Sequence, residues 1–362
     1  MDYKEILKEQ FHNVVDLDQI DEISKETYEL SEGLSESFSL EKILESTLNG
    51  ESFFHNQELI SGIQDLALYE IRNAMILGVE ILIICVVIGL LKNLSASFGS
   101  KSMSDISMLV CTMVIIGISM NSFRIVYQLA LDSVSVMVST MEILTPILLG
   151  IMISTGAVTS GSILSPVIIG SVTGFGVILK KIILPALFVA TILGLINCLT
   201  EKDYVNKLGK LIRNASLIVT GLIIAVLTGI ITIQGLITET SDSLLMSAAK
   251  YSLSTFIPIV GGFTSDTIEL FLRCMGTIKN VVGVFAVITL VLIVVVPLIK
   301  ILIIALIYKL TAAVTEPVSE SKISDGLNEM GSCLISMASI MFFCALLFIM
   351  FVSIILRIGG NA

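Results

Sequence analysis

Long apolar runs separated by short polar segments dominate the chain after residue 70. Each clear run supplies about the 20 apolar residues that an α-helix needs to cross roughly 30 Å of hydrocarbon. Six runs meet this length: Ala74–Leu91, Ile106–Phe123, Ile182–Leu199, Ala215–Ile237, Val281–Tyr308 and Leu334–Leu356. The pattern predicts an all-α, polytopic membrane protein with six clear spans.

Glycine and proline interrupt the region between the second and third clear spans. Its apolar stretches are Pro146–Leu164 and Pro166–Leu179. They are predicted to form either two short spans or one re-entrant pair, and both options keep the number of crossings even. Irregular backbone at this depth persists only where protein or water covers its polar groups.

A Pro/Gly pattern recurs at one constant offset along the chain, so that Pro146 pairs with Pro258 and Pro185 pairs with Pro297. Paired interruptions of this kind are typical of transporter-like or channel-like proteins. The pattern predicts an internal repeat, and coincidence among frequent residues is the alternative. The candidate path or hinge residues are Pro146, Gly150, Pro166, Pro185, Pro258, Gly261, Gly262 and Pro297.

Acidic residues are concentrated before the first span. The chain is 55% hydrophobic and 14% charged, with a net charge of −10. Residues 1–70 hold 17 Asp and Glu against 4 Lys, whereas the rest of the chain holds 14 acids and 17 bases. The acidic segment argues against a nucleic-acid partner, which requires a basic face. Its apolar spacing predicts short amphipathic helices near 39–48 and 59–68.

The placement of lysine and arginine predicts the orientation. Basic loops at 92–105 and 200–214 are expected in the cytoplasm, as are Lys300 and Lys309 at the end of the fifth span. Because each crossing changes the side of the membrane, counting the spans places the C-terminus outside the cytoplasm and the acidic loop 310–333 inside it. The first span then begins outside, so the acidic N-terminal segment is extracytoplasmic.

This topology makes the repeat parallel and divides the chain into five parts. They are the acidic extracytoplasmic segment (1–70), the first span with its cytoplasmic loop (71–105), repeat unit one (106–199), the basic loop with repeat unit two (200–311), and a cytoplasmic loop with the last span (312–362).

Ionisable residues in apolar runs usually face a bundle interior or a wet cavity. Glu80 interrupts the first span and is a candidate for a pore lining or an interhelical contact, although a position near the wet interface is the alternative. Asp266, Glu269 and Arg273 share one helical face, where they form either the charged rim of a path or an intrahelical ion pair.

An amphipathic stretch follows the second span. Arg124 stands at the end of that span, as a membrane charge or as a side chain that snorkels to the interface. Asp132 and Glu142 lie in the stretch itself and are expected to face water.

Motifs for catalysis are absent. The sequence has no GxxxxGK[ST] and no HExxH, so it predicts a non-enzyme, and another subunit must supply any ATP hydrolysis. Its two histidines, His12 and His55, lie in the acidic segment, which excludes a histidine-built metal site in the membrane. The prediction is therefore no catalytic, cofactor-binding or metal residue. The start Met1–Glu5 also lacks the pattern of a secretory leader.

Several longer motifs carry a resemblance to a known family. They are Asn121–Phe123, Leu144–Ile147, Ser165–Ile168, Leu211–Asn214, Phe256–Gly261, Leu298–Leu302 and Ile307–Lys309. Together they resemble stage III sporulation protein AE of endospore-forming bacteria, over roughly residues 40–357. Members of that family usually begin with a leader peptide, a feature that this chain does not share.

The resemblance implies a multi-pass protein of the mother-cell membrane that surrounds the forespore. It implies a secretion-like channel complex that links the two cells and is needed for forespore development after engulfment. The implied partners are the lipid bilayer and other stage III A proteins, including a separate cytosolic ATPase and ring-forming proteins of the intermembrane space. A homo-oligomer is compatible with this role. The alternatives are a self-sufficient permease for a small solute and a non-conducting membrane scaffold for partner proteins.

Overall fold

The computed structural model describes Phe11 and residues 17–30, 57–98, 101–199, 206–256, 261–317 and 321–358. These parts of the chain are helices and short turns, without a strand among them, which confirms the all-α prediction. The helices are α2 (Leu17–Leu30), α4 (Gln57–Phe98), α5 (Lys101–Ser154), α6 (Val158–Ile178), the π-helix η3 (Leu179–Ile183), α7 (Leu184–Asn197), α8 (Asn206–Phe256), α9 (Gly261–Thr315) and α10 (Ser321–Arg357).

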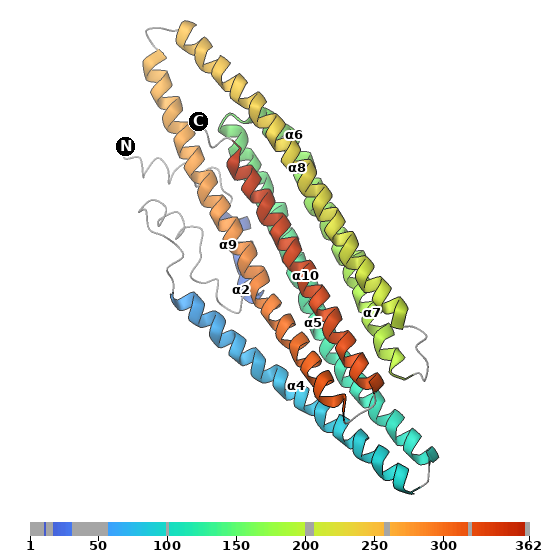
Figure 1. Ribbon diagram of the computed structural model, residues 1–362. Helices are drawn as coiled ribbons and strands as arrows, with labels where there is room; N and C mark the ends of the chain where they lie inside the picture. The colour runs from blue at the N-terminus through green and yellow to red at the C-terminus, as the bar shows by residue number, and fades with distance from the viewer. Residues whose placement is uncertain are drawn as a thin grey trace.

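Within these ranges, six helical segments are long and apolar enough to cross a membrane, which confirms the polytopic class. Helices α5, α8 and α9 contain 54, 51 and 55 residues. Each is about 80 Å long at a rise of 1.5 Å per residue, whereas a bilayer core is about 30 Å thick. The predicted spans are therefore parts of longer helices in an elongated bundle (Figure 1).

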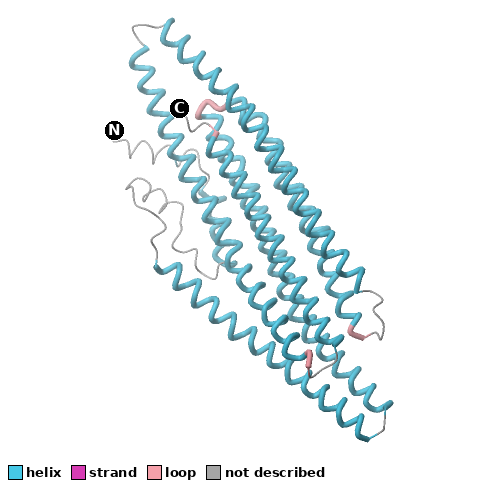
Figure 2. Tube along the Cα trace, in the orientation of Figure 1, coloured by secondary structure: helices cyan, strands magenta, loops and turns pink. Residues whose placement is uncertain are grey.

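The ends of the long helices lie at the two ends of this bundle (Figures 1 and 2). Helices α4, α7 and α9 end at the lower end in this view, where α5, α8 and α10 begin. The turn between α5 and α6 lies at the upper end, as does the last turn of α10. The three connections that were predicted to be cytoplasmic thus share one end, and which side of the membrane that end occupies stays a prediction.

The Pro/Gly-rich region, predicted to form short spans or a re-entrant pair, is a helical hairpin. Helix α5 continues through Pro146 to Ser154, and α6 begins at Val158. Between them Gly156 has φ of 93°, a left-handed conformation that glycine adopts without strain. The turn divides the stretch Pro146–Leu164, so each half extends the helix of a neighbouring span.

A π-helical turn interrupts the descending arm of this hairpin. It covers Leu179–Ile183, immediately before Pro185 near the start of α7. Proline has no amide hydrogen, so the carbonyl of Lys181 lacks its usual helical donor, and the wider π turn makes room for the proline ring. Pro185 therefore has a local effect on helix geometry at a position that was predicted as a hinge.

The acidic segment contributes α2 to the described fold. The side chains of Ile20, Ile23 and Thr27 are buried, and the helix packs against α5 and α9. The helix predicted at 39–48 lies outside the described residues, whereas residues 59–68 belong to the first turns of α4.

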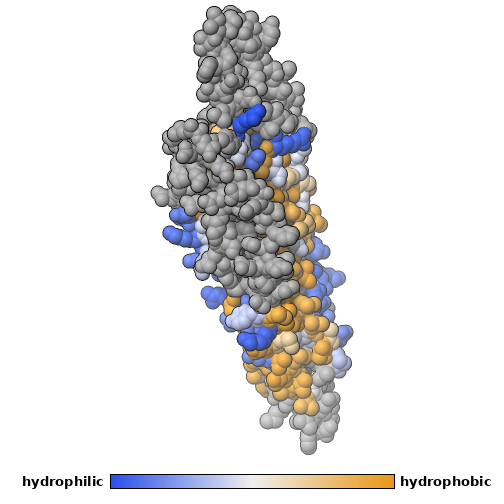
Figure 3. All heavy atoms as spheres, turned by 90° about the vertical axis from the view of Figure 1, so that its left-hand side faces the viewer, coloured by the Kyte–Doolittle hydropathy of each residue, from blue (hydrophilic) through white to orange (hydrophobic). Residues whose placement is uncertain are grey.

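An ion pair sets the register between the parallel helices α4 and α9. Lys300 Nζ lies 3.2 Å from Glu70 Oε1, and both side chains are mostly buried. Two turns further along, Gly78 faces Ile307. Lys300 was expected at the end of the fifth span but lies inside α9. The first apolar run, Ala74–Leu91, begins close to the level of this ion pair and extends from there toward the lower end of the bundle. Figure 3 shows apolar side chains gathered over the lower part of this side of the bundle.

Helices α9 and α10 approach closely at Gly331. A Cβ atom added there would lie 3.0 Å from the carbonyl oxygen of Ala305 and 2.8 Å from Lys309 Cγ. Small residues at such contacts allow helix backbones to pack tightly in membranes.

We expect Gly331→Val to force these helices apart. Overpacking of this kind typically lowers the free energy of unfolding by about 1–3 kcal/mol, so the thermal midpoint of the purified protein in detergent should fall by several degrees. Gly221→Val is the matched control, because a Cβ at Gly221 of α8 meets nothing within 4 Å. Equal midpoints for the two variants would contradict the close approach.

Candidate functional site

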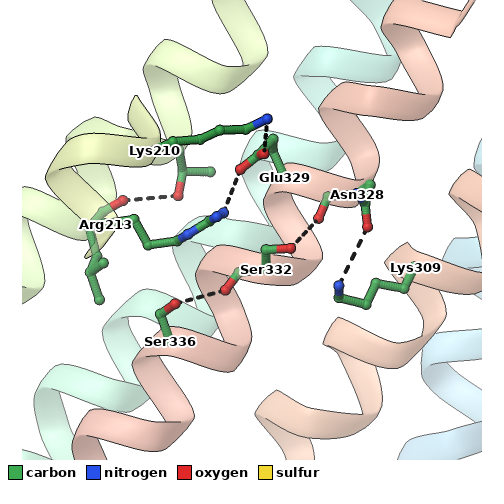
Figure 4. A network of polar contacts seen from close by, with 9 residues as sticks. Lys210, Arg213, Lys309, Asn328, Glu329, Ser332 and Ser336 are labelled. Carbon is green, nitrogen blue, oxygen red and sulfur yellow. Dashed lines mark hydrogen bonds and ion pairs between the residues drawn. The ribbon is translucent and has the colours of Figure 1, made fainter. Parts of the chain in front are cut away.

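Glu329 of α10 lies between two basic side chains of α8 (Figure 4). Its Oε1 lies 3.1 Å from Lys210 Nζ, and its Oε2 accepts a hydrogen bond from Arg213 Nη1. The side chains of Glu329 and Arg213 are 15% and 16% exposed, against 49% for Lys210. The pair Arg213–Glu329 is therefore the one largely removed from solvent, and Lys210 closes the contact from outside.

Further polar contacts extend this charge cluster to α9. Lys309 Nζ donates to Asn328 Oδ1 at 3.4 Å, and the hydroxyl of Ser332 donates to the carbonyl oxygen of Asn328 at 2.9 Å. The cluster joins α8, α9 and α10 toward the lower end. It also places Glu329, one of the acidic residues of region 310–333, against two cations of the basic loop 200–214.

A buried lysine holds the opposite end of α10. Lys279 of α9 is 1% exposed, and its Nζ donates to the carbonyl oxygen of Ile358 at 2.7 Å. The last carbonyl groups of a helix lack helical donors, and a cation there also complements the helix dipole. Together with the cluster at Glu329, this bond fixes α9 and α10 relative to each other at both ends.

A row of polar side chains follows one face of α5. Its members recur every three or four residues, which is the spacing of one helical face. This row, the α5 polar stripe, consists of Asn121, Arg124, Gln128, Asp132, Ser135, Ser139 and Glu142. The charged and amide side chains are exposed, and the two serines are half-buried. Asp132 and Glu142, which were expected to face water, are both exposed in the chain.

The second arm of the hairpin contributes polar groups to this stripe. The hydroxyl of Thr173 on α6 donates to Glu142 Oε1 at 2.9 Å. Lys180 of η3 donates to the hydroxyl of Ser135 at 3.4 Å. The polar surface therefore belongs to the hairpin as a unit rather than to α5 alone.

The structure brings three of the predicted site residues to one face. Pro146 and Gly150 follow Glu142 at intervals of four residues on α5, and both are exposed. Arg124 belongs to the stripe itself. Pro166 is also exposed, but it lies on α6.

The other predicted residues lie elsewhere. Glu80 is exposed on α4 among apolar side chains, Arg273 is exposed on α9, Pro185 is half-buried, and Pro297 is buried within α9. Pro258 lies outside the described residues. Gly261, Gly262, Asp266 and Glu269 belong to α9, but their side-chain surroundings lie outside the described part of the chain. A path at the second Pro/Gly motif stays a prediction.

Sequence reasoning missed the contacts of Lys279, Lys300 and Glu329. The stripe could have been found from the sequence, because polar residues recur every three or four positions along 121–142, which is the spacing of one helical face. The contacts of Lys279, Lys300 and Glu329 carry no such local signal, because their partners lie far away in the sequence.

The described side chains offer little for metal or thiol chemistry. Within the described ranges, no group of three His, Cys, Asp or Glu side chains could hold a metal ion. At the end of α7, the thiol of Cys198 donates to the carbonyl oxygen of Lys322 at 3.3 Å. Burial, with a smaller effect from Asp325, raises the pKa of this thiol to about 11. The thiol therefore stays protonated near neutral pH, and a protonated thiol is a poor nucleophile and a poor metal ligand.

Six apolar helical segments, held together by interhelical charge contacts, define a multi-pass α-helical membrane protein. The chain belongs to the family Stage III sporulation protein AE, which matches residues 38–359, and is thus a member of a sporulation protein family. A relative named Stage III sporulation protein AE, from Bacillus subtilis (strain 168), is 27% identical over 316 residues, which cover 86% of this chain and 78% of the relative. No solved structure matches the chain.

We expect Glu329→Ala to destabilise the bundle strongly. Removal of one partner from a buried ion pair typically costs about 3–5 kcal/mol, because the other charge is left without compensation. Lys210→Ala should cost less than about 1 kcal/mol, because that lysine is half exposed. Unfolding of the purified protein in detergent measures both effects.

A double variant distinguishes this pairing from a general packing defect. Arg213→Ala combined with Glu329→Ala should be less destabilised than the sum of the single variants, because neither charge is then left alone. Additive losses would show that the two side chains do not interact.

Proposed function

We propose that the protein is a multi-pass membrane subunit of a secretion-like channel complex that links the mother cell and the forespore. In this proposal it lies in the mother-cell membrane around the forespore, with its acidic N-terminal segment outside the cytoplasm. Forespore development after engulfment requires it. Membership of a sporulation family whose name places it in the stage III A group supports the proposal.

The length of the helices is the structural observation that carries a role within a complex. Helices α5, α8 and α9 contain 54, 51 and 55 residues, so each is far longer than a bilayer crossing requires. At the rise of an α-helix, roughly 50 Å of each lies beyond a hydrocarbon core that is about 30 Å thick. A small-solute permease needs little structure outside the bilayer. Helices that project this far provide surfaces for protein partners on either side of the membrane.

The proposed partners are the other stage III A proteins. They include a separate ATPase in the cytosol and ring-forming proteins between the two membranes. The chain itself acts without catalysis, and the lack of a phosphate-binding loop in its sequence fits an energy source on another subunit.

The other two functions make different demands on the structure. A self-sufficient permease would enclose a solute site within one chain, whereas the α5 polar stripe lies open on the surface of the chain. A scaffold without a path would need no exposed polar stripe on a helix that is long and apolar enough to cross a membrane. The channel subunit is therefore the function that the described features favour.

A clean deletion of the gene in its native host tests the proposal. We expect development to stop after engulfment, so that the count of heat-resistant spores falls by orders of magnitude and returns when the intact chain is supplied from another locus. Normal spores from the deletion strain would contradict the proposed function. Solute uptake by liposomes that contain the purified chain alone, driven by an ion gradient, would favour the permease instead.

A further inference from the structure

Helices α8, α9 and α10 define a common membrane depth in the bundle. The apolar runs of α8 and α10 begin close to the ion pair Arg213–Glu329. They also end together, because Gly235 of α8 packs beside Ile354 of α10. The bond from Lys279 to the C-terminal end of α10 aligns the run of α9 with them.

The α5 polar stripe lies at this same depth. Just below its first residue, the carbonyl oxygen of Ser119 accepts a hydrogen bond from Tyr308 Oη, at the end of the α9 run. At its other end, Glu142 bonds Thr173, and nearby Phe175 packs against Phe348 inside the α10 run. The helix rises about 32 Å from Asn121 to Glu142, which is close to the thickness of a bilayer core.

A charge in the middle of this depth is unfavourable in contact with lipid. The exposed carboxyl group of Asp132 lies there, about 16 Å from either end of the stripe, whereas the exposed Arg124 and Glu142 lie near its two edges. Intramembrane charges face a bundle interior or a water-filled cavity. The bond from Gln128 to Asp132 Oδ1, 2.9 Å long, keeps both groups on the stripe and leaves them on its open side.

The lipid-facing surface belongs to other helices. Few residues of the apolar span of α8 are buried in the chain, and Ile218, Leu222 and Val226 are exposed on it. Helix α8 packs against α6, α7 and α10, whereas α5 packs against α4, α6, α9 and α10. The described part of each chain thus presents an apolar surface on α8 and, on a different helix, the α5 polar stripe.

We propose that the α5 polar stripe lines a water-filled passage that several copies of this chain enclose together. One chain supplies a single α5 polar stripe, which is exposed on its surface, so the passage is incomplete without further copies. Cyclic symmetry repeats the stripe around a common axis and turns α8 outward to lipid. Charges of both signs line such a passage, so it suits polar cargo without excluding either sign. This inference deepens the proposed channel function and rests on it.

Cysteine labelling in proteoliposomes tests the passage. The background is a chain in which alanine replaces all six native cysteines: Cys85, Cys111, Cys198, Cys274, Cys333 and Cys344. Single cysteines are then introduced as Asp132→Cys and Glu142→Cys in the stripe. Val226→Cys is the lipid-facing control, and Met137→Cys, at a fully buried position of α5, is the packing control.

A charged, water-soluble methanethiosulfonate reagent should modify both stripe positions at least tenfold faster than position 226, and it should leave position 137 unmodified. Gln128→Cys serves as a second exposed stripe position if a charge substitution prevents folding. Stripe positions that react as slowly as position 226 would overturn the water-filled passage. If the stripe reacts but the protein is monomeric in the membrane, the proposal that several copies enclose the passage would be overturned.

These outcomes are independent of spore formation, because the assay uses the purified chain. An unreactive stripe combined with a sporulation defect in the deletion strain would remove this inference and leave the proposed function intact. Normal sporulation with a reactive stripe would remove the proposed function instead.

Discussion

A charged side chain at membrane depth needs either a polar partner or water, and this constraint organises the bundle. Insertion scales assign about 2.5–3.5 kcal/mol to an Arg, Lys or Asp at the centre of a membrane helix. At the two edges of the apolar runs, Glu329 pairs with Arg213 and Lys279 donates to a carbonyl group of α10. Each contact joins two helices, so the pairing that removes this cost also fixes how the helices align.

The backbone obeys a related constraint, because its polar groups find no water in the hydrocarbon. Long helices satisfy them internally, and this explains why prolines break the chain so little. Pro146, Pro166 and Pro297 all lie inside helices. The break that reverses the chain occurs at Gly156, where a left-handed φ is needed. The disturbance near Pro185 is absorbed by a single π turn.

The sequence predicts the six apolar helical segments because hydropathy is a local property of the chain, although the second run, Ile106–Phe123, is only the first part of a longer apolar segment, Leu109–Ser154. It predicts less about the region after Glu142, because a proline in a membrane helix leaves open whether the helix ends there or continues. The partners of Glu329 could not be predicted, since Arg213 lies 116 residues away. Asp132 and Glu142 were expected to face water, and the helical period of the stripe contained the information that they share a face with Arg124.

The stagger between α4 and α9 implies that a flat bilayer does not cover all of the apolar surface. The pair Glu70–Lys300 places the start of one apolar run beside the final third of the other. From Val281 to the level of Leu91, the combined apolar band spans about 60 Å, twice a bilayer core of about 30 Å. Part of this band therefore requires protein contacts rather than lipid. A chain that exposes both a polar stripe at membrane depth and apolar surface beyond it is built to be completed by neighbouring subunits.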